Sequence, residues 1–265
     1  MDLSHADVVL ALRAAGCVFA EDEADLLLAQ AETPAGLADL VARRVSGLPL
    51  EQVLGWAAFA GLRVVVEPGV FVPRRSSELL VREAVRLAGG GRPVVVDLCC
   101  GSGAVGVAVL DRVPGAELHA ADVDPAAVRC ARRNVEPVGG HVHEGDLDAP
   151  LPRTLLGRVD VLVANAPYVP TDEIAFMPPE AREHEAAVAL DGGADGVEVH
   201  RRLTAVAGRW LAPGGYLLIE TSERQAPLTA AAMERAGLVP VVVHDDDVDV
   251  TVVVGARHRP AVPRA

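Results

Sequence analysis

The sequence predicts an α/β protein whose main part is an open, mostly parallel β-sheet covered by helices. Three observations lead to this prediction. From residue 93 onward, short apolar runs alternate with helical patterns, as in consecutive strand–helix units. The first run, Pro93–Leu98, is almost continuously apolar, as expected for a strand buried on both faces, and glycines follow it. Before residue 50, in contrast, apolar residues recur at helical spacing.

The N-terminal part, residues 1–50, is expected to form a small helical module. Two helices are predicted over Ala6–Ala15 and Glu23–Gln30, where the apolar residues share one helical face. A third helix should begin at Thr33–Pro34, because threonine caps a helix and proline suits its first position. It should end near Val45. No chemical motif lies in this module.

A β-hairpin linker is expected over residues 51–72. Its strands are predicted over Leu54–Phe59 and Leu62–Glu67, on either side of the turn at Ala60–Gly61. The next helix is predicted over Ser76–Leu87. Three successive glycines at 89–91 follow it and end the helical pattern.

Residues 73–265 are expected to form the catalytic domain with a seven-stranded sheet. The predicted strands are Pro93–Leu98, Glu117–Ala121, His141–His143, Val159–Ala164, Tyr216–Glu220, Val239–His244 and Val250–Gly255. The later helices are predicted over Asp124–Val135, Val197–Trp210 and Ala226–Ala236. Because no helix separates the last two strands, we expect one antiparallel strand at the end of the sheet.

Composition excludes several classes of protein. The chain has 265 residues and a net charge of −13, and all its 24 basic side chains are arginines. This acidic balance argues against extensive nucleic-acid binding, which needs a basic face. The first residues include acids and only short apolar runs, so we expect no secretion leader, and no apolar run is long enough to cross a membrane. The four cysteines lack metal-ligand spacing, so we expect reduced thiols in a cytoplasmic protein and no metal site. We also expect a monomer.

The glycine turn after the first strand has two interpretations. Gly101, Gly103 and Gly106 match the dinucleotide-binding fingerprint, in which Asp122 would hold a ribose. The alternative is an S-adenosylmethionine site, in which the glycines let the backbone approach the ligand and no pyrophosphate is bound. A strand–turn–helix unit without a ligand is the simplest possibility.

Three acids at predicted strand ends favour S-adenosylmethionine. Asp97 ends the first strand, where it would hold the ammonium group of the ligand. Asp122 ends the second strand and would bind ribose hydroxyls, and Asp146 follows the third and would meet the adenine amino group. Three carboxylates suit a cationic ligand and repel a diphosphate. Asp122 also has a simpler interpretation, in which Asp124 caps the next helix and Asp122 is only a solvated strand end.

The segment Asn165–Ala166–Pro167–Tyr168 follows the fourth strand, at the edge where open α/β sheets bind ligands. An asparagine oxygen and a backbone carbonyl can accept the two hydrogens of a planar NH2 group and aim its nitrogen at a methyl donor. Pro167 restricts the residue before it to extended conformations, and Tyr168 offers a ring for stacking. A strand-ending turn with a packed tyrosine is the alternative.

These four residues resemble the Asn-Pro-Pro-Tyr signature of methyltransferases that act on amino nitrogens. The surrounding stretches resemble one branch, the protein glutamine-N(5) methyltransferases of the HemK/PrmC group, which modify peptide-chain release factors. The matching stretches are Leu54–Gly55, Phe59 to Leu62, Pro68–Glu78, Glu185, Ala189–Gly196, Leu211–Gly215 and Glu220.

The resemblance implies a class I, Rossmann-like methyltransferase that uses S-adenosylmethionine to methylate a glutamine side-chain nitrogen. The residues that would bind the cofactor are Asp97, Cys99, Gly101, Gly103, Asp122, Asp146 and Asn165. The residues that would hold and position the glutamine are Asn165, Ala166, Pro167 and Tyr168. Arg74 and Glu78 would bind substrate from the hairpin side; alternatively, they form a surface ion pair.

Several positions depart from the family pattern. Ala166 replaces the first proline of the signature, and Cys99 replaces the usual first glycine of the cofactor loop. Asp246–Val250 stands where the family has Gly-x-x-Arg-Val. These departures suit a paralogue with a different protein substrate. Two other functions share parts of the pattern: an adenine N(6) methyltransferase on DNA or RNA, and a non-catalytic module that binds the cofactor.

Overall fold

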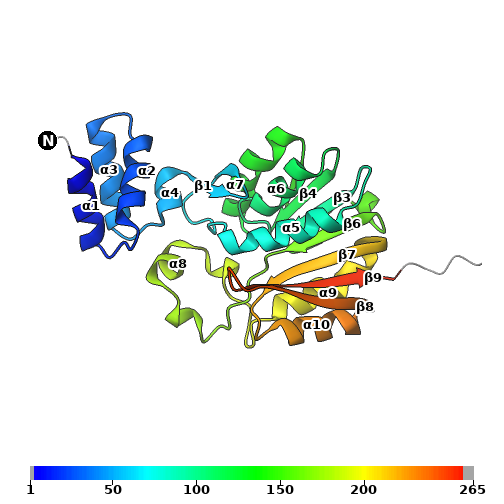
Figure 1. Cartoon of the computed structure of the whole chain (residues 1–265). Helices are drawn as coiled ribbons and strands as arrows, with labels where there is room; N and C mark the ends of the chain where they lie inside the picture. Colours follow the sequence, from blue (N-terminus) through cyan, green and yellow to red (C-terminus); the bar gives the residue numbers. More distant parts are fainter. Residues whose placement is uncertain (1–2, 259–265) are drawn as a thin grey trace, which may run out of the picture.

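The computed structural model describes residues 3–258, and a seven-stranded sheet forms its centre (Figure 1). The strand order is β5-β4-β3-β6-β7-β9-β8. The strands are β3 (Val94–Leu98), β4 (Glu117–Asp122), β5 (His141–Glu144), β6 (Val159–Ala164), β7 (Leu211–Thr221), β8 (Leu238–Asp245) and β9 (Val250–Arg257). All neighbours pair in parallel except β9, which is antiparallel to β7 and to β8. The expected mostly parallel sheet with one antiparallel strand is therefore confirmed.

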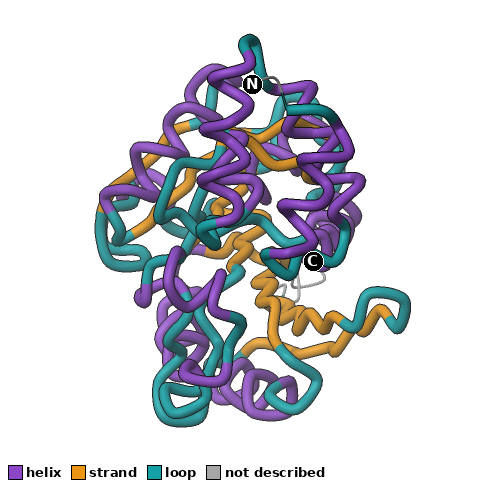
Figure 2. The backbone as a smooth tube through the Cα atoms, turned by 90° about the vertical axis from the view of Figure 1, so that its left-hand side faces the viewer, coloured by secondary structure: helices purple, strands orange, loops and turns teal. Residues whose placement is uncertain are grey.

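Helices cover both faces of this sheet, as Figure 2 shows from the side. One hydrophobic core lies under α5 (Glu78–Leu87), α6 (Ala104–Arg112) and α7 (Pro125–Val135). A second core lies under α9 (Glu198–Trp210) and α10 (Ala226–Arg235). The central strands bury nearly all their side chains because they contribute to both cores.

The N-terminal module consists of α1 (His5–Ala14), α2 (Ala20–Gln30) and α3 (Pro34–Val45), which pack around a separate small core. Figure 1 shows these helices to one side of the sheet. The predicted cap of α3 is confirmed, because the Thr33 hydroxyl accepts a hydrogen bond of 3.0 Å from the Gly36 N–H.

One arginine of the module, Arg44, forms a buried ion pair within the module and a second contact to the rest of the chain. Arg44 of α3 pairs with Glu23 at 2.6 Å, and its guanidinium also reaches Glu180 of α8 (Pro179–His184) at 3.4 Å. Helix α8 belongs to the long segment between β6 and α9, for which the sequence pattern predicts neither a helix nor a strand.

The hairpin begins later than expected. Leu54 does not start a strand; it ends a short helix, α4 (Leu50–Leu54), which Gly55 terminates with a φ of 81°. The hairpin strands are β1 (Trp56–Phe59) and β2 (Leu62–Val65). No helix within residues 3–258 has the length and apolar character needed to cross a membrane.

The sheet register brings three chain segments together at one edge. In the parallel pairing, Leu98 at the end of β3 lies opposite Ala121 of β4 on one side and Ala164 of β6 on the other. The residues that follow these three strands therefore meet where ligands bind in open α/β sheets.

Candidate active site

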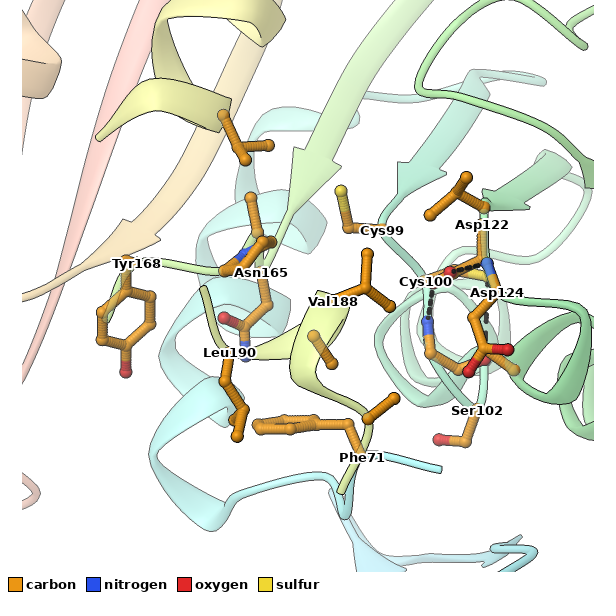
Figure 3. Close-up of a pocket in the computed structure, with 18 of the residues that line it drawn as sticks. Phe71, Cys99, Cys100, Ser102, Asp122, Asp124, Asn165, Tyr168, Val188 and Leu190 are labelled. Atoms are coloured by element: carbon orange, nitrogen blue, oxygen red, sulfur yellow. Dashed lines mark hydrogen bonds between the residues drawn. The ribbon is translucent and has the colours of Figure 1, made fainter. Parts of the chain in front are cut away.

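A cavity of about 620 Å³ lies at this edge of the sheet. It is lined by the segments that follow β3, β4 and β6 and by residues between β6 and α9 (Figure 3). The sequence-predicted residues that line it are Arg74, Asp97, Cys99, Gly101, Asp122, Asp146, Asn165, Ala166, Pro167 and Tyr168. Gly103 and Glu78 do not line it. The cavity thus brings together two groups of residues, an acidic side and an acceptor side, which are defined below.

The acidic side consists of Asp97, Asp122 and Asp146. Asp97 is buried, and its Oδ2 accepts a hydrogen bond of 2.9 Å from the Gly106 N–H. Burial raises the pKa of Asp97 to about 7, and the charge of Asp122 adds to this rise. A bound cation would stabilise the ionised form of both acids, so this side of the cavity is suited to a positively charged ligand.

Asp122 fastens the glycine turn. Its Oδ2 accepts from the Gly101 N–H at 2.8 Å, and its Oδ1 accepts from the Asp124 N–H at 2.9 Å. Asp124 caps α7, since its Oδ1 accepts from the Ala126 N–H. Asp122 is therefore more than a solvated strand end: burial raises its pKa, and its second lone pairs can still accept ribose hydroxyls.

The glycine turn contains unusual backbone conformations. Gly101 has a φ of 54° and Gly103 has a φ of 77°. A Cβ at Gly103 would also press on the Val135 side chain, so Gly103 shapes the turn from behind the cavity. Cys99 has a φ of 57°, a conformation that L-residues rarely adopt, and its thiol faces the cavity (Figure 3). Burial raises the pKa of this thiol, so it stays uncharged.

Asp146 completes the acidic side at the surface. Its Oδ2 accepts a hydrogen bond of 2.5 Å from the Arg202 guanidinium, and both side chains are about half exposed. Arg202 comes from α9 and also lines the cavity. Because solvent screens this pair, Asp146 can exchange Arg202 for an amino group of a ligand at little cost.

The acceptor side consists of Asn165, Ala166, Pro167 and Tyr168, directly after β6 (Figure 3). The Asn165 Nδ2 donates a hydrogen bond of 3.0 Å to the Ser77 Oγ, which leaves Oδ1 as an acceptor. No donor among residues 3–258 is bonded to the Ala166 carbonyl. Burial raises the pKa of Tyr168 to about 12, so its hydroxyl stays protonated. Two acceptors and an aromatic ring therefore lie together.

A glycine loop before α9 supports the acceptor side. A Cβ at Gly192 would collide with the backbone of Pro167 and Tyr168, and a Cβ at Gly196 would overlap the Tyr168 carbonyl. The Tyr168 carbonyl also accepts a hydrogen bond of 2.7 Å from the Gln225 Nε2. The glycines allow this loop to pack directly against the backbone of the acceptor side.

Arg74 and Glu78 lie in different surroundings. Arg74 pairs at 2.6 Å with Glu185, whose side chain is fully buried, and it borders the cavity. Glu78 instead accepts a hydrogen bond of 3.1 Å from the Ala60 N–H in the hairpin turn. The structure therefore neither brings Glu78 to the cavity nor pairs it with Arg74, because the first turn of α5 directs Glu78 toward the hairpin.

Sequence reasoning assigned no role to three polar residues around the site. Ser77 bonds Asn165, the Glu185 carboxylate accepts from the Val72 N–H and from Arg74, and Glu220 is buried beside Tyr168. All three lie in stretches that match the family pattern. That match was their one signal, since none of them stands in a local motif.

Comparisons with known proteins identify the family. A family model described as "Methyltransferase small domain" matches residues 61–177. The "Release factor glutamine methyltransferase" of Geobacter sulfurreducens is 38% identical over 220 residues, which cover 82% of this chain and 76% of that protein. The chain belongs to the release factor glutamine methyltransferase family. It is an S-adenosylmethionine-dependent enzyme, which decides between the two interpretations of the glycine turn.

Two further matches show how broad the similarity is. The "4-amino-L-phenylalanine/4-methylamino-L-phenylalanine methyltransferase" of Streptomyces pristinaespiralis is 36% identical over 242 residues, 89% of this chain and 82% of that protein. A methyltransferase structure from Pyrococcus furiosus aligns with a TM-score of 0.57 at 17% identity, covering 75% of this chain and 90% of that one. The structural match shows the shared fold of these enzymes.

The residues present fit S-adenosylmethionine. The ligand carries a cationic sulfur and an ammonium group, and the acidic side offers carboxylates for both. Gly106 has no Cβ, and one built there would touch the Asp97 carboxylate and the Leu118 side chain. The helix can therefore approach the acid closely at this point.

Proposed function

We propose that this enzyme methylates the side-chain amide nitrogen of a glutamine in a peptide-chain release factor, in the cytoplasm. One observation carries the proposal: the Asn165 Oδ1 and the Ala166 carbonyl form a pair of acceptors beside the acidic side of the cavity. The names of relatives that are 38–41% identical support the choice of substrate.

The acceptor pair addresses the main difficulty of the reaction. An amide nitrogen is a weak nucleophile because its lone pair is conjugated with the carbonyl group. Two acceptors that hold both N–H hydrogens place the lone pair toward a methyl group and stabilise the positive charge that develops on nitrogen. S-adenosylmethionine supplies an electrophilic methyl group on a positively charged sulfur. The nitrogen releases one proton to solvent after the transfer.

Tyr168 and Pro167 serve the same geometry. Tyr168 is buried enough to stay neutral and offers a flat surface to a planar amide. Pro167 limits the backbone freedom of Ala166, which keeps the carbonyl aimed. Ala166 stands where the family signature has proline. It is fully buried, so alanine at this position keeps the packing closed to solvent.

A second candidate substrate is the aromatic amine of a free amino acid. The relative named for 4-amino-L-phenylalanine matches a longer part of this chain than the Geobacter enzyme does, 242 against 220 residues. An arylamine is also planar and conjugated, so the same acceptor pair can hold it. The two candidates differ in size, because a free amino acid fits inside a cavity, whereas a protein loop must enter it from outside.

Transfer from labelled S-adenosylmethionine distinguishes the two candidates. The enzyme is incubated with purified peptide-chain release factors, with 4-amino-L-phenylalanine, and with duplex DNA as a third acceptor. We expect label on a glutamine of the release factors and none on DNA. Label on the free amino acid alone would replace the protein substrate by the small one. The matched variant Asn165→Ala should bind the cofactor in calorimetry and transfer nothing; normal transfer by this variant contradicts the role of Asn165.

A further inference from the structure

Glu220 is a buried carboxylate that the proposed reaction does not yet use. It lies on β7 with 1% of its surface exposed, and its Oε2 has no hydrogen-bond partner among the described residues. Burial raises its pKa to about 7. An unpaired oxygen on a buried carboxylate costs free energy, so its presence beside an active site needs an explanation.

The sheet places Glu220 next to the acceptor side. In the β6–β7 pairing, Ala164 lies opposite Ile219, so the next residues, Asn165 and Glu220, follow at the same edge. Ser77 joins them from the start of α5. Its hydroxyl accepts the Asn165 Nδ2 hydrogen bond at 3.0 Å, and the same hydroxyl lies close enough to the Glu220 carboxyl to lower its pKa against the effect of burial. The three side chains form a chain from Glu220 through Ser77 to Asn165.

The number of available hydrogens fixes the direction of this chain. A hydroxyl group has one hydrogen, and an ionised carboxylate only accepts, so Ser77 must give its hydrogen to Glu220. The Ser77 oxygen can then only accept from Asn165, which puts Nδ2 at Ser77 and turns Oδ1 toward the cavity. If Glu220 is protonated, it can donate to Ser77, and Ser77 can donate to Oδ1. The amide of Asn165 can then turn and present hydrogens where an acceptor is needed.

We propose that Glu220 is a positioning residue that sets, through Ser77, which end of the Asn165 amide faces the methyl acceptor. This inference rests on the proposed function for the role of Asn165 as an acceptor of N–H hydrogens, but the orientation of the amide can be measured without any substrate. Glu220 itself touches neither cofactor nor substrate in this scheme.

Glu220 is the member of the Glu220–Ser77–Asn165 series whose charge changes near neutral pH. The Glu220 charge raises the pKa of Tyr168, and the Arg74 charge acts on Tyr168 in the opposite sense. Tyr168, with a pKa of about 12, stays neutral when Glu220 ionises. The interactions that act on Glu220 are its burial, which favours the neutral form, and the Ser77 hydroxyl, which favours the charged form.

The composition makes the orientation of Asn165 directly observable. The whole chain has two asparagines, Asn134 and Asn165, so selective ¹⁵N-asparagine labelling gives two side-chain NH2 signals. Asn134 serves as an internal reference, because its Nδ2 donates to backbone carbonyls of Val65 and Ser102. The signals are followed in the full-length protein from pH 5.5 to 9.

We expect the Asn165 signal to shift with a midpoint near pH 7 in the wild type, and the shift to vanish in Glu220→Gln and in Ser77→Ala. The Asn134 signal should stay in place. A shift that persists in Glu220→Gln would assign the effect to another acid, such as Asp97, and overturn the proposal. An Asn165 signal that never moves would overturn it too. Two variants are included because Glu220→Gln alters a buried site, and thermal melting verifies that both fold.

Kinetics separate positioning from simple stability. Ser77→Ala should lower kcat about tenfold or more and leave the cofactor Kd within about twofold, since only the acceptor side is affected. Wild-type kcat should fall below pH 7, and Glu220→Gln should remove that fall. Thr204→Val is the control. It deletes a buried hydroxyl elsewhere, on α9, and should keep the kcat and pH profile of the wild type. Unchanged kcat in Ser77→Ala contradicts the inference, whereas a wild type inactive on every acceptor contradicts the proposed function and leaves the NMR result to decide the positioning role.

Discussion

The acidic side and the acceptor side of the cavity are held in place by different kinds of contact. On the acidic side, Asp97 and Asp122 bond backbone N–H groups 9 and 21 residues away, within neighbouring strand–helix units. The exposed Asp146, which pairs with Arg202 across 56 residues, is the exception. On the acceptor side, Asn165 bonds Ser77 across 88 residues, and the Tyr168 carbonyl bonds Gln225 across 57 residues. The two buried acids of the acidic side are therefore held by local structure, whereas the acceptor side is held by contacts that require the whole sheet to assemble.

Gly196→Ala should show the largest difference between the two sides, with a strong effect on the acceptor side and little effect on cofactor binding. The new Cβ would overlap the Tyr168 carbonyl and the Gln225 side chain, and Gly196 has a φ of 72°, which disfavours alanine. We expect kcat to fall about 100-fold, as a displacement of about 1 Å can cause. The free energy of unfolding should fall by about 3 kcal/mol, and the cofactor Kd should change little. Calorimetry, kinetics and thermal melting measure these effects.

Gly208→Ala is the matched control. Gly208 lies within α9, and no atom stands within 4 Å of the Cβ that alanine would add. This variant should gain up to about 1 kcal/mol in stability from the helix preference of alanine and keep full activity. If Gly196→Ala weakens cofactor binding as much as it lowers kcat, the two sides are not independent.

A lower pH should weaken cofactor binding on the acidic side, because Asp97 becomes protonated. The folded-state pKa of Asp97 is about 7, above the usual value near 4, so the side chain is neutral below pH 7. A neutral Asp97 cannot attract a cationic ligand. The cofactor Kd should therefore rise about tenfold as the pH falls from 8 to 6, roughly what one pKa unit of differential binding gives. Calorimetry at pH 6, 7 and 8 measures this.

Two variants identify the origin of that pH dependence. Asp97→Asn should bind the cofactor weakly at pH 8 and show a flat profile, because its side chain cannot ionise. Asn165→Ala should keep the wild-type profile, because it belongs to the acceptor side. A pH dependence that survives in Asp97→Asn would point to Asp122, whose pKa burial also raises.

The sequence was sufficient to predict the acidic side because each of its signals is local. An apolar strand, an acid at its end and a glycine turn stand next to one another in the chain, and the strand–helix repeat then fixes where successive strand ends meet. The sheet order places the acids around one cavity without any long-range information beyond this repeat.

The acceptor side was predictable only in part. Asn165–Tyr168 could be found from its chemistry, but its support could not, because Ser77 and Glu220 reach Asn165 through the placement of α5 and the β6–β7 register. The same limit applies to the hairpin. The apolar character of Leu54 predicts the start of a strand, and the left-handed Gly55 that follows makes Leu54 the end of a helix instead.

Cys99→Gly should have the smallest effect, and it measures strain on the acidic side. Cys99 holds a φ of 57°, which glycine adopts without cost, so the free energy of unfolding should change by no more than about 1 kcal/mol, in the stabilising direction. Cys99→Ala keeps a Cβ and should gain nothing. Chemical denaturation compares the two variants. Equal stability of both would show that the turn stores no strain at this position.

The position of β9 between β7 and β8 determines when this enzyme can become active during its own synthesis. The strands β3 to β6 pair with one another in parallel and are complete by residue 164. The outer edge of β7, the strand that carries Glu220, gains its neighbour only when residues 250–257 have left the ribosome. A nascent chain can therefore form the acid-lined half of its cavity early, whereas the acceptor side is completed only after residues 250–257 have been made and have paired with β7.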